Sequence, residues 1–197
     1  MDANREENGY YENQRFENIR LEGETLDNCR FVECEFINCR LTDCRLTHCS
    51  FVECQFRECV VTSLDTKYTV VKNASLTDCS LVGVHWGSMQ SEYTQTIEKL
   101  SGCRMKYNSF VGMNLKKSSF CRMELVDSVF EECRLEEGDF SESRLDRTQF
   151  LNCDLRKADF RGAQGYQVDI TSCRMKDAKF SFPEVVSLLG VLGIRGE

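Results

Sequence analysis

The chain has 197 residues, and its 32 acidic and 25 basic side chains leave a net charge of −7. This acidic balance argues against direct nucleic-acid binding, which depends on clustered Lys and Arg. The sequence has no apolar run of about eighteen residues, as a membrane helix requires, and no apolar stretch of a secretory signal near its N-terminus, so we expect a single cytoplasmic domain.

Residues 1–10 show no regular pattern, and we expect them to form a flexible N-terminal segment. From Tyr11 to Trp86 nearly every fifth residue is apolar, and the same spacing resumes, shifted by four positions, from Leu100 to Phe180. A helix repeats about every 3.6 residues and a strand about every 2.0, so a period of five fits neither. A sustained fixed period indicates a repeat architecture.

Two positions before most of these apolar residues stands a small or thiol-bearing side chain. A spacing of two places both side chains on one face of a short extended segment, so the pair points inward and the other, mostly polar positions point outward. Four such segments, each turning a corner, would close a coil of about twenty residues, with successive coils about 4.8 Å apart.

The twenty-residue coil predicts which interior side chains stack. In the first half, Phe31 is expected beneath Phe51, Phe36 beneath Phe56 and Leu41 beneath Val61. In the second half, one column is predicted to contain Phe120, Phe140, Phe160 and Phe180, and the opposite column Phe110, Phe130, Phe150 and Ile170. Large and smaller columns would then alternate around the coil and fill its interior.

This pattern is similar to that of the pentapeptide-repeat proteins over about Tyr11 to Phe182. The resemblance implies an all-β fold, a right-handed quadrilateral β-helix that spans residues 11–182 and is interrupted by a loop at 87–99. A fold of this kind does not by itself reveal a function.

The thirteen cysteines fit the same repeat. All except Cys121, which is expected to point outward, occupy the inner position where other repeats carry Ala or Ser, so we interpret them as buried free thiols in a reducing compartment. Neighbouring cysteines between Cys29 and Cys59 would lie on different sides of a coil, and those twenty residues apart would stack in parallel. Neither arrangement builds a tetrahedral pocket, and we expect no metal and no cofactor.

No catalytic motif accompanies the repeat. His48 and His85 have no nucleophile or metal partner at a recognised spacing, and no phosphate-binding glycine loop is present. We therefore expect a protein that is not an enzyme.

The largest interruption of the repeat is Gly87–Lys99, which shifts the register by four positions. We expect this segment to loop out of the stack, where loops often carry function, and Glu92 and Tyr93 are then candidates for partner contact. A tolerated surface insertion is the simpler alternative.

Two weaker irregularities keep the phase of the repeat. Thr66 and Gly165 stand where other repeats carry an apolar residue. The segment around Thr66 is interpreted as a distorted coil, and Tyr166 is expected to fill the gap left by Gly165.

Residues 183–197 depart from the repeat and are expected to form a helix and tail. Pro183 and Glu184 suit the first turn of a helix, and Gly190 or Gly193 its end. One coil end cannot bury all the apolar surface of this helix, which favours a homodimer joined at the C-terminus, with a monomeric cap as the alternative. The dimerisation candidates are Phe182, Val185, Val186, Leu188, Leu189 and Leu192.

Acidic side chains are unevenly distributed. Residues 1–60 carry 13 acidic and 7 basic side chains. A further acidic run, which we call the acidic belt, supplies candidates for partner contact: Glu131, Glu132, Glu136, Glu137, Asp139 and Glu142. A solvated surface is the alternative explanation of the belt.

The interrupting loop, the overall acidity and the tail Phe-Pro-Glu-Val-Val-Ser-Leu-Leu-Gly are similar to those of the Qnr and MfpA type of pentapeptide-repeat proteins. This resemblance implies a DNA mimic that binds DNA gyrase and topoisomerase IV and modulates the action of quinolones or toxins. A structural or adaptor rod for another protein–protein interaction is the alternative, and self-protection against a topoisomerase-poisoning peptide antibiotic shares the first target.

Overall fold

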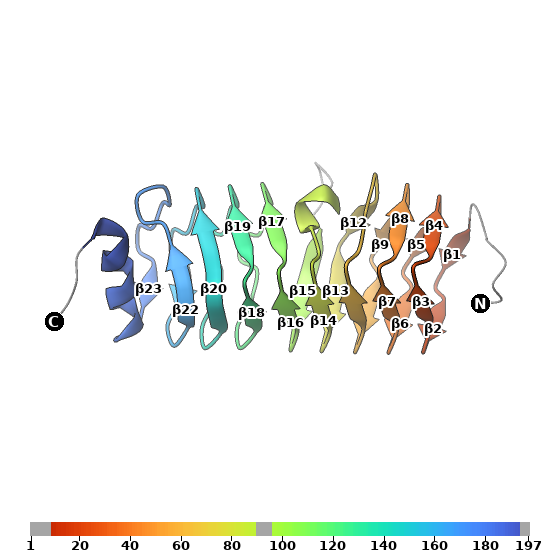
Figure 1. The fold of residues 1–197 in the computed structure, drawn as a ribbon, viewed down its shortest axis with the longest axis horizontal. Helices are drawn as coiled ribbons and strands as arrows, with labels where there is room; N and C mark the ends of the chain where they lie inside the picture. The colour runs from red at the N-terminus through yellow and green to blue at the C-terminus, as the bar shows by residue number, and fades with distance from the viewer. Residues whose placement is uncertain (1–8, 90–95, 194–197) are drawn as a thin grey trace. The chain divides into compact units, whose positions relative to one another are not determined.

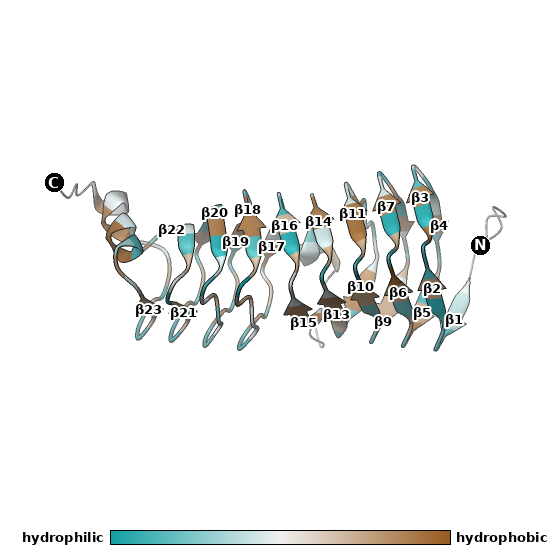
Figure 2. Ribbon diagram, turned by 90° about the horizontal axis from the view of Figure 1, so that it is seen from below, coloured by the Kyte–Doolittle hydropathy of each residue, from teal (hydrophilic) through white to brown (hydrophobic). Residues whose placement is uncertain are grey.

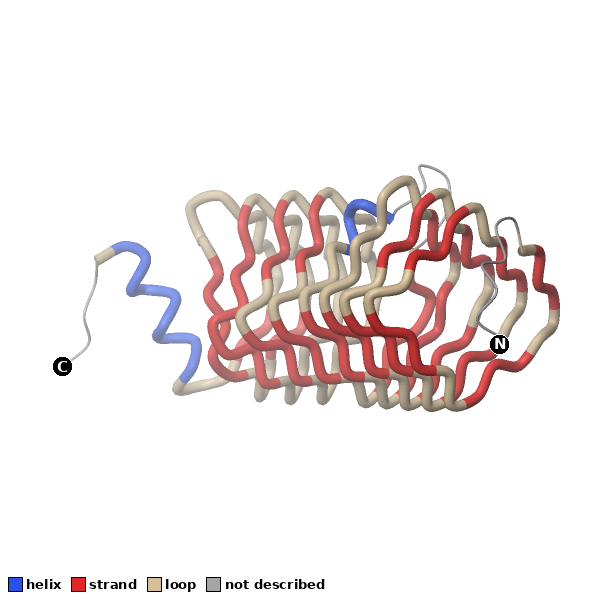
Figure 3. The backbone as a smooth tube through the Cα atoms, turned by 45° about the vertical axis from the view of Figure 1, so that its right-hand side comes forward, coloured by secondary structure: helices blue, strands red, loops and turns tan. Residues whose placement is uncertain are grey.

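A computed structural model of the chain describes residues 9–89 and 96–193 (Figure 1). The chain divides into two compact units, unit 1 (residues 1–104) and unit 2 (residues 105–197). Within each unit the backbone winds in coils, with short strands along the sides and turns at the corners (Figure 3). Among the described residues, no helix combines the length and apolar character needed to cross a bilayer.

Unit 1 is built from three- to five-residue strands and one 3-10 helix. These are β1 (Tyr10–Glu12), β2 (Arg15–Glu17), β3 (Arg20–Glu22), β4 (Thr25–Asp27), β5 (Arg30–Val32), β6 (Glu35–Ile37), β7 (Arg40–Thr42), β8 (Arg45–Thr47), β9 (Ser50–Val52), β10 (Gln55–Arg57), β11 (Val60–Thr62), β12 (Val70–Lys72), β13 (Ala74–Thr77), β14 (Ser80–Val82), η1 (Trp86–Met89) and β15 (Ile97–Ser101). The strands β1, β5, β9 and β12 form one parallel ladder. Strand β16 (Arg104–Lys106) contains the division between the units.

The predicted stacking of unit 1 is confirmed. Phe31 is the register partner of Phe51, as are Phe36 and Phe56 on the next side, and Leu41 and Val61 on a third side. The rings of Phe31 and Phe51 stack with centroids 4.9 Å apart. A coil of twenty residues therefore follows directly from the five-residue period of the sequence.

The corners of the coils are formed by residues in the left-handed conformation. In unit 1 these include Asn13, Asn28, Glu33, Asp43 and Glu53, with φ between 51° and 55°. Asn and Asp tolerate this conformation better than other side chains, so their frequent occurrence at corner positions suits the fold. Glutamate, as at Glu33 and Glu53, is less usual in this conformation.

Unit 2 has strands of two to eight residues and ends in a second 3-10 helix. Its elements are β17 (Ser109–Val111), β18 (Glu124–Val126), β19 (Val129–Glu131), β20 (Arg144–Leu151), β21 (Asp159–Phe160), β22 (Gln164–Val168), β23 (Lys179–Phe180) and η2 (Glu184–Leu192). The ring centroids of Phe120 and Phe140 lie 4.9 Å apart, and those of Phe140 and Phe160 lie 4.8 Å apart. This column continues to Phe180, as predicted.

The opposite Phe column of unit 2 ends differently from the prediction. Phe150 pairs with Val168 and not with Ile170, because the register of β22 against β20 shifts from twenty residues at Arg144 and Gln164 to 18 residues from Thr148 onward. Gly165, near the start of β22, has a φ of +75°. The next residue, Tyr166, is buried, and its ring centroid lies 5.5 Å from that of Phe160. Tyr166 thus fills the gap, as expected, and Ile170 is displaced from the column.

The interruption after Trp86 is shorter than residues 87–99. Met89, at the end of η1, is buried, and Ile97 is buried at the start of β15, which pairs with β13. These two buried side chains keep the residues on both sides of the interruption packed in the coils of unit 1. Thr66 is also buried, and its hydroxyl forms a hydrogen bond of 2.9 Å with that of Ser88.

The inner cysteines lie where the repeat places them. Cys34, Cys54 and Cys133 are at most 1% exposed, and no cysteine of the chain, all of which lie in the described ranges, forms a disulfide. Each of these three thiols donates to a backbone carbonyl, as Cys54 does to Val52 at 3.5 Å. Burial raises the pKa of the Cys54 thiol to about 11, which keeps it protonated and unreactive.

Candidate functional site

Three of the six carboxylates of the acidic belt in unit 2 form ion pairs with basic side chains. Its ion pairs join Glu136 to Arg156 at 3.0 Å, Glu137 to Lys117 at 3.7 Å and Glu142 to Arg122 at 2.6 Å. In each pair the partners are twenty residues apart, so they face one another on successive coils. The hydrogen bond from Arg122 holds the pKa of the Glu142 carboxyl below its usual range.

The remaining members of the belt differ in their surroundings. Asp139 accepts hydrogen bonds from the Ser141 amide at 2.9 Å and from its hydroxyl at 2.6 Å, within its own corner. Glu131 is half-buried and Glu132 exposed, and neither has a basic partner among residues 9–89 and 96–193. The belt is therefore a set of local ion pairs with two unpaired carboxylates.

Unit 1 carries a second group of carboxylates, gathered around one hollow of the surface. A surface hollow of about 630 Å³ is lined by Asn13, Glu33, Glu35, Glu53, Gln55, Asn73 and Glu98. We call this group the carboxylate edge. Among the described residues it contains four carboxylates and three amides but no basic side chain.

The fold itself assembles the carboxylate edge. Glu33 and Glu53 turn the same corner on successive coils, and the Glu33 amide donates to the Val52 carbonyl at 2.8 Å. On the adjoining side, Glu35 is the register partner of Gln55. The twenty-residue period of the sequence could have revealed both pairings, because Glu33 and Glu53 are twenty residues apart.

The carboxylates of this edge are poorly compensated. Glu35 lies 3.5 Å from Arg57, and Glu98 accepts a hydrogen bond from the Ser75 hydroxyl at 3.3 Å. Glu33 and Glu53 are exposed, and neither forms an ion pair within the described part of the chain. Like charges that face one another on neighbouring strands destabilise a sheet, so the arrangement has an electrostatic cost.

The C-terminal helix η2 is rich in apolar residues (Figure 2), and several of their side chains are exposed. Phe182, just before the helix, is 84% exposed, and Val186, Leu189 and Leu192 are also exposed. The other dimerisation candidates, Val185 and Leu188, are half-buried. The predicted helix is present, in 3-10 form, and Gly193 ends it with φ of +72° and an N–H that donates to Gly190.

The other predicted positions contribute no chemical site. Glu92 and Tyr93 lie outside the described residues. His48 is 3.5 Å from the Asp27 carboxylate and its ring stacks on that of Tyr68 at 5.1 Å, all on exposed surface. Within the described ranges, no group of three or more His, Cys, Asp or Glu is arranged to hold a metal ion.

The sequence matches the family described as pentapeptide repeat region over residues 11–90 and 103–180. A comparison with curated proteins returned no match. A trypsin-treated form of QnrB1, a plasmid-mediated fluoroquinolone resistance protein, is 18% identical with a TM-score of 0.49, and the alignment covers 92% of this chain and 99% of that one. HetL, a pentapeptide repeat protein involved in heterocyst differentiation regulation from the cyanobacterium Nostoc sp. strain PCC 7120, is 16% identical with a TM-score of 0.39, covering 85% of this chain and 87% of that one. Because the family match extends over most of its length, the chain belongs to the pentapeptide repeat family.

Proposed function

We propose that the protein is a non-enzymatic, DNA-mimicking binder of a type II topoisomerase, DNA gyrase or topoisomerase IV, and that the carboxylate edge makes the contact. The observation that carries this proposal is the stack of Glu33 on Glu53, exposed and without basic partners in the described residues. A surface that leaves like charges facing one another has an electrostatic cost that a positively charged partner would relieve.

The spacing of the carboxylates supports mimicry of a nucleic-acid backbone. Coils stack about 4.8 Å apart, which sets the rise from Glu33 to Glu53. Each strand of duplex DNA places a phosphate about every 3.4 Å along the helix axis, so the two charge repeats are of similar size. A protein channel lined with Lys and Arg for DNA would attract such an edge and guide its approach.

The resemblance to the Qnr and MfpA type supports DNA gyrase or topoisomerase IV as the partner in this proposal, and a change in quinolone or toxin action as the outcome. The same resemblance and the exposed apolar residues of η2 support a cytoplasmic homodimer joined through the C-terminus. Burial of Phe182, Val186 and Leu189 against a second copy would remove this apolar surface from water.

A supercoiling assay tests the proposal. Purified protein is titrated into DNA gyrase with relaxed plasmid, with and without a quinolone, at two salt concentrations. We expect either rescue of supercoiling from the drug or inhibition in its absence, and a weaker effect at the higher salt because salt screens exposed charges. No effect at a several-fold molar excess of folded protein would contradict the proposal and leave the adaptor function.

Two charge-reversal variants locate the contact. The double variant Glu33→Lys/Glu53→Lys changes the carboxylate edge, and Glu131→Lys/Glu132→Lys makes the same change in net charge on the acidic belt. We expect the first to abolish the effect and the second to retain most of it. Equal losses would indicate that net charge, and not the edge, governs binding. Loss only with the second would assign the contact to the belt.

A further inference from the structure

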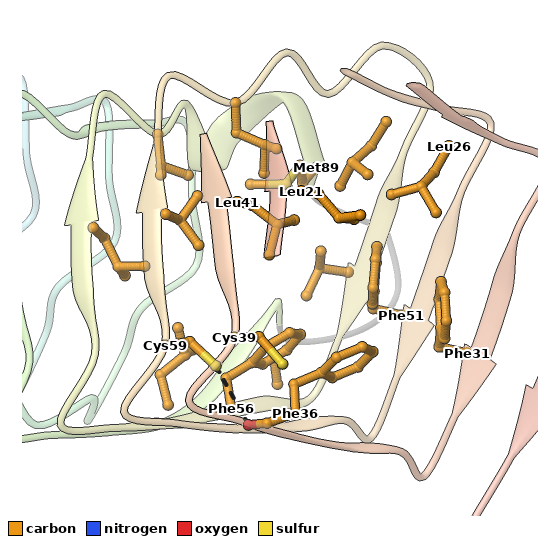
Figure 4. Close-up of a pocket in the computed structure, with 18 of the residues that line it drawn as sticks. Leu21, Leu26, Phe31, Phe36, Cys39, Leu41, Phe51, Phe56, Cys59 and Met89 are labelled. Carbon is orange, nitrogen blue, oxygen red and sulfur yellow. Dashed lines mark hydrogen bonds between the residues drawn. The ribbon is translucent and has the colours of Figure 1, made fainter. Parts of the chain in front are cut away.

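Unit 1 contains an apolar cavity in the interior of its coils. The cavity has a volume of about 110 Å³ and extends from the first coil, at Phe16 and Leu21, to Trp86 and Met89. Its walls are aliphatic and aromatic side chains together with the thiols of two cysteines (Figure 4). Of the residues that the structure describes, no charged one and none with a hydroxyl or amide side chain lines it.

The cavity arises from the order of large and small columns around the coil. In unit 2 the columns of Phe110 and Phe120 are ten residues apart and lie on opposite sides, where their rings meet edge to face across the interior. In unit 1 the columns of Phe31 and Phe36 are five residues apart and lie on adjoining sides, with ring centroids 5.4 Å apart. The two sides across from them line the cavity mainly with leucine and valine, among them Leu21 and Leu41 (Figure 4), and the ring of Trp86 lies at the last coil of the cavity.

The exposure of the interior side chains reflects this difference. Phe130 and Leu155 of unit 2 are 0% exposed. Phe36, Leu41 and Val61 occupy equivalent inward positions in unit 1, line the cavity and keep accessible surface. Unit 2 is therefore packed to the density expected of a protein interior, and unit 1 is not.

The lining offers nothing to hold water. A buried water needs two to four polar partners, and the two thiols already donate to backbone carbonyls, Cys39 to Phe16 at 3.4 Å and Cys59 to Phe36 at 3.4 Å. An engineered cavity of about 150 Å³ lined by Leu, Ile and Phe stays dry and binds benzene or xenon. The cavity of unit 1 has the same lining chemistry and a somewhat smaller volume.

From this packing we infer that the interior of unit 1 is a binding site for a small apolar guest, of the size of a xenon atom or a single hydrocarbon ring. The guest would replace missing dispersion contacts at the corner of Leu21, Leu41 and Val61. The site does not include the carboxylate edge and needs no topoisomerase, so the binding of a guest can be tested separately from the proposed function.

Methyl NMR under xenon pressure tests the inference on the full chain. With Leu and Val methyls labelled, we expect saturable shifts at Leu41 and Val61, and none at Leu135 and Leu155, which lie in the filled interior of unit 2. Benzene is expected to shift the same methyls. The absence of shifts at Leu41 and Val61, or equal shifts in both units, would overturn the inference.

A matched pair of substitutions tests the free volume without a ligand. Leu41→Phe adds a ring where the cavity lies, and Leu155→Phe makes the same change at a fully packed position. We expect Leu41→Phe to keep or raise the Tm, by up to about 2–4 °C, and to abolish the xenon shifts at Val61, while Leu155→Phe lowers the Tm by at least as much. The smaller change Val61→Leu, which adds one methylene, is expected to raise the Tm and weaken xenon binding. Equal destabilisation by both phenylalanine variants together with a lowered Tm for Val61→Leu would show that the space is absent in solution.

Discussion

Glu33 and Glu53 turn the same corner on successive coils of unit 1, with φ of 51° and 55°, and both line a hollow to which residues 9–89 and 96–193 contribute no basic side chain. Elsewhere the same twenty-residue spacing joins opposite charges, as it does for Arg122 and Glu142 in unit 2. A basic residue twenty positions away can thus neutralise a corner carboxylate, but Glu33 and Glu53 face each other instead. That contrast distinguishes the carboxylate edge from an ordinary solvated surface.

The single variant Glu33→Lys separates stability from binding. It places a cation opposite Glu53 at the spacing that forms ion pairs in unit 2, so we expect a small rise in the urea midpoint, while activity in the supercoiling assay falls. Glu142→Lys is the control, because it breaks an existing pair with Arg122 and is expected to lower the midpoint slightly. A Glu33→Lys variant with unchanged activity would remove Glu33 from the contact surface.

The pH dependence of stability is expected to come mainly from unit 2. Hydrogen bonds from Arg156 lower the pKa of Asp154, and Arg161 does the same for Asp159. A carboxyl whose folded pKa lies below its unfolded value of about 4 stabilises the protein above that pH and loses this contribution as the pH falls through the folded pKa. The urea midpoint should therefore fall as the pH is lowered from about 5 to 2. Asp154→Asn should flatten this dependence, and an unchanged profile would contradict the assignment.

Gly165 is expected to be intolerant of a side chain. Its φ is +75°, and a Cβ there would lie 2.5 Å from Asp146 Oδ1 and 2.8 Å from Asp146 Cα. Gly165→Ala should cost at least about 1–2 kcal/mol in the free energy of unfolding, from the backbone conformation alone. Gly190→Ala is the control, because no atom lies within 4 Å of its Cβ position. Urea denaturation of both variants measures the difference, and equal stabilities would contradict the close approach to Asp146.

Thiol reactivity should single out Cys121. Cys121 and Cys173 are half-buried, whereas the other cysteines are buried. Burial and a hydrogen bond involving the Cys153 thiol raise the pKa of Cys173, which suppresses its thiolate. A chromogenic thiol reagent should therefore modify Cys121 rapidly in the native protein and all thirteen thiols in denaturant. Loss of the rapid phase in Cys121→Ser identifies the residue, and persistence of that phase would point to another thiol.

The exposed face of η2 is expected to hold a dimer together. Val186→Asp/Leu189→Asp places charges on exposed apolar positions and should convert a dimer to a monomer in analytical ultracentrifugation, with little change in circular dichroism. Lys179→Asp, an exposed charge reversal in β23, serves as the control and should leave the mass unchanged. A wild-type protein that is monomeric at all concentrations would instead support a cap on its own coil.

The sequence alone determined the coil of twenty residues and the inward Phe and Cys columns, because the five-residue period leaves one pattern of buried side chains. It also determined the terminal helix, through Pro183 and Glu184 at its start and Gly193 at its end. It did not determine that Val168 replaces Ile170 beside Phe150, since that offset depends on how closely the backbone at Gly165 approaches Asp146. The partial neutralisation of the acidic belt and the exposure of Glu33 and Glu53 likewise depend on which side chains meet across coils. The spacing of the Phe residues, five or ten, indicates which columns adjoin, but the cavity was decided only in three dimensions, because its volume depends on how closely the side chains of the four columns meet across the coil.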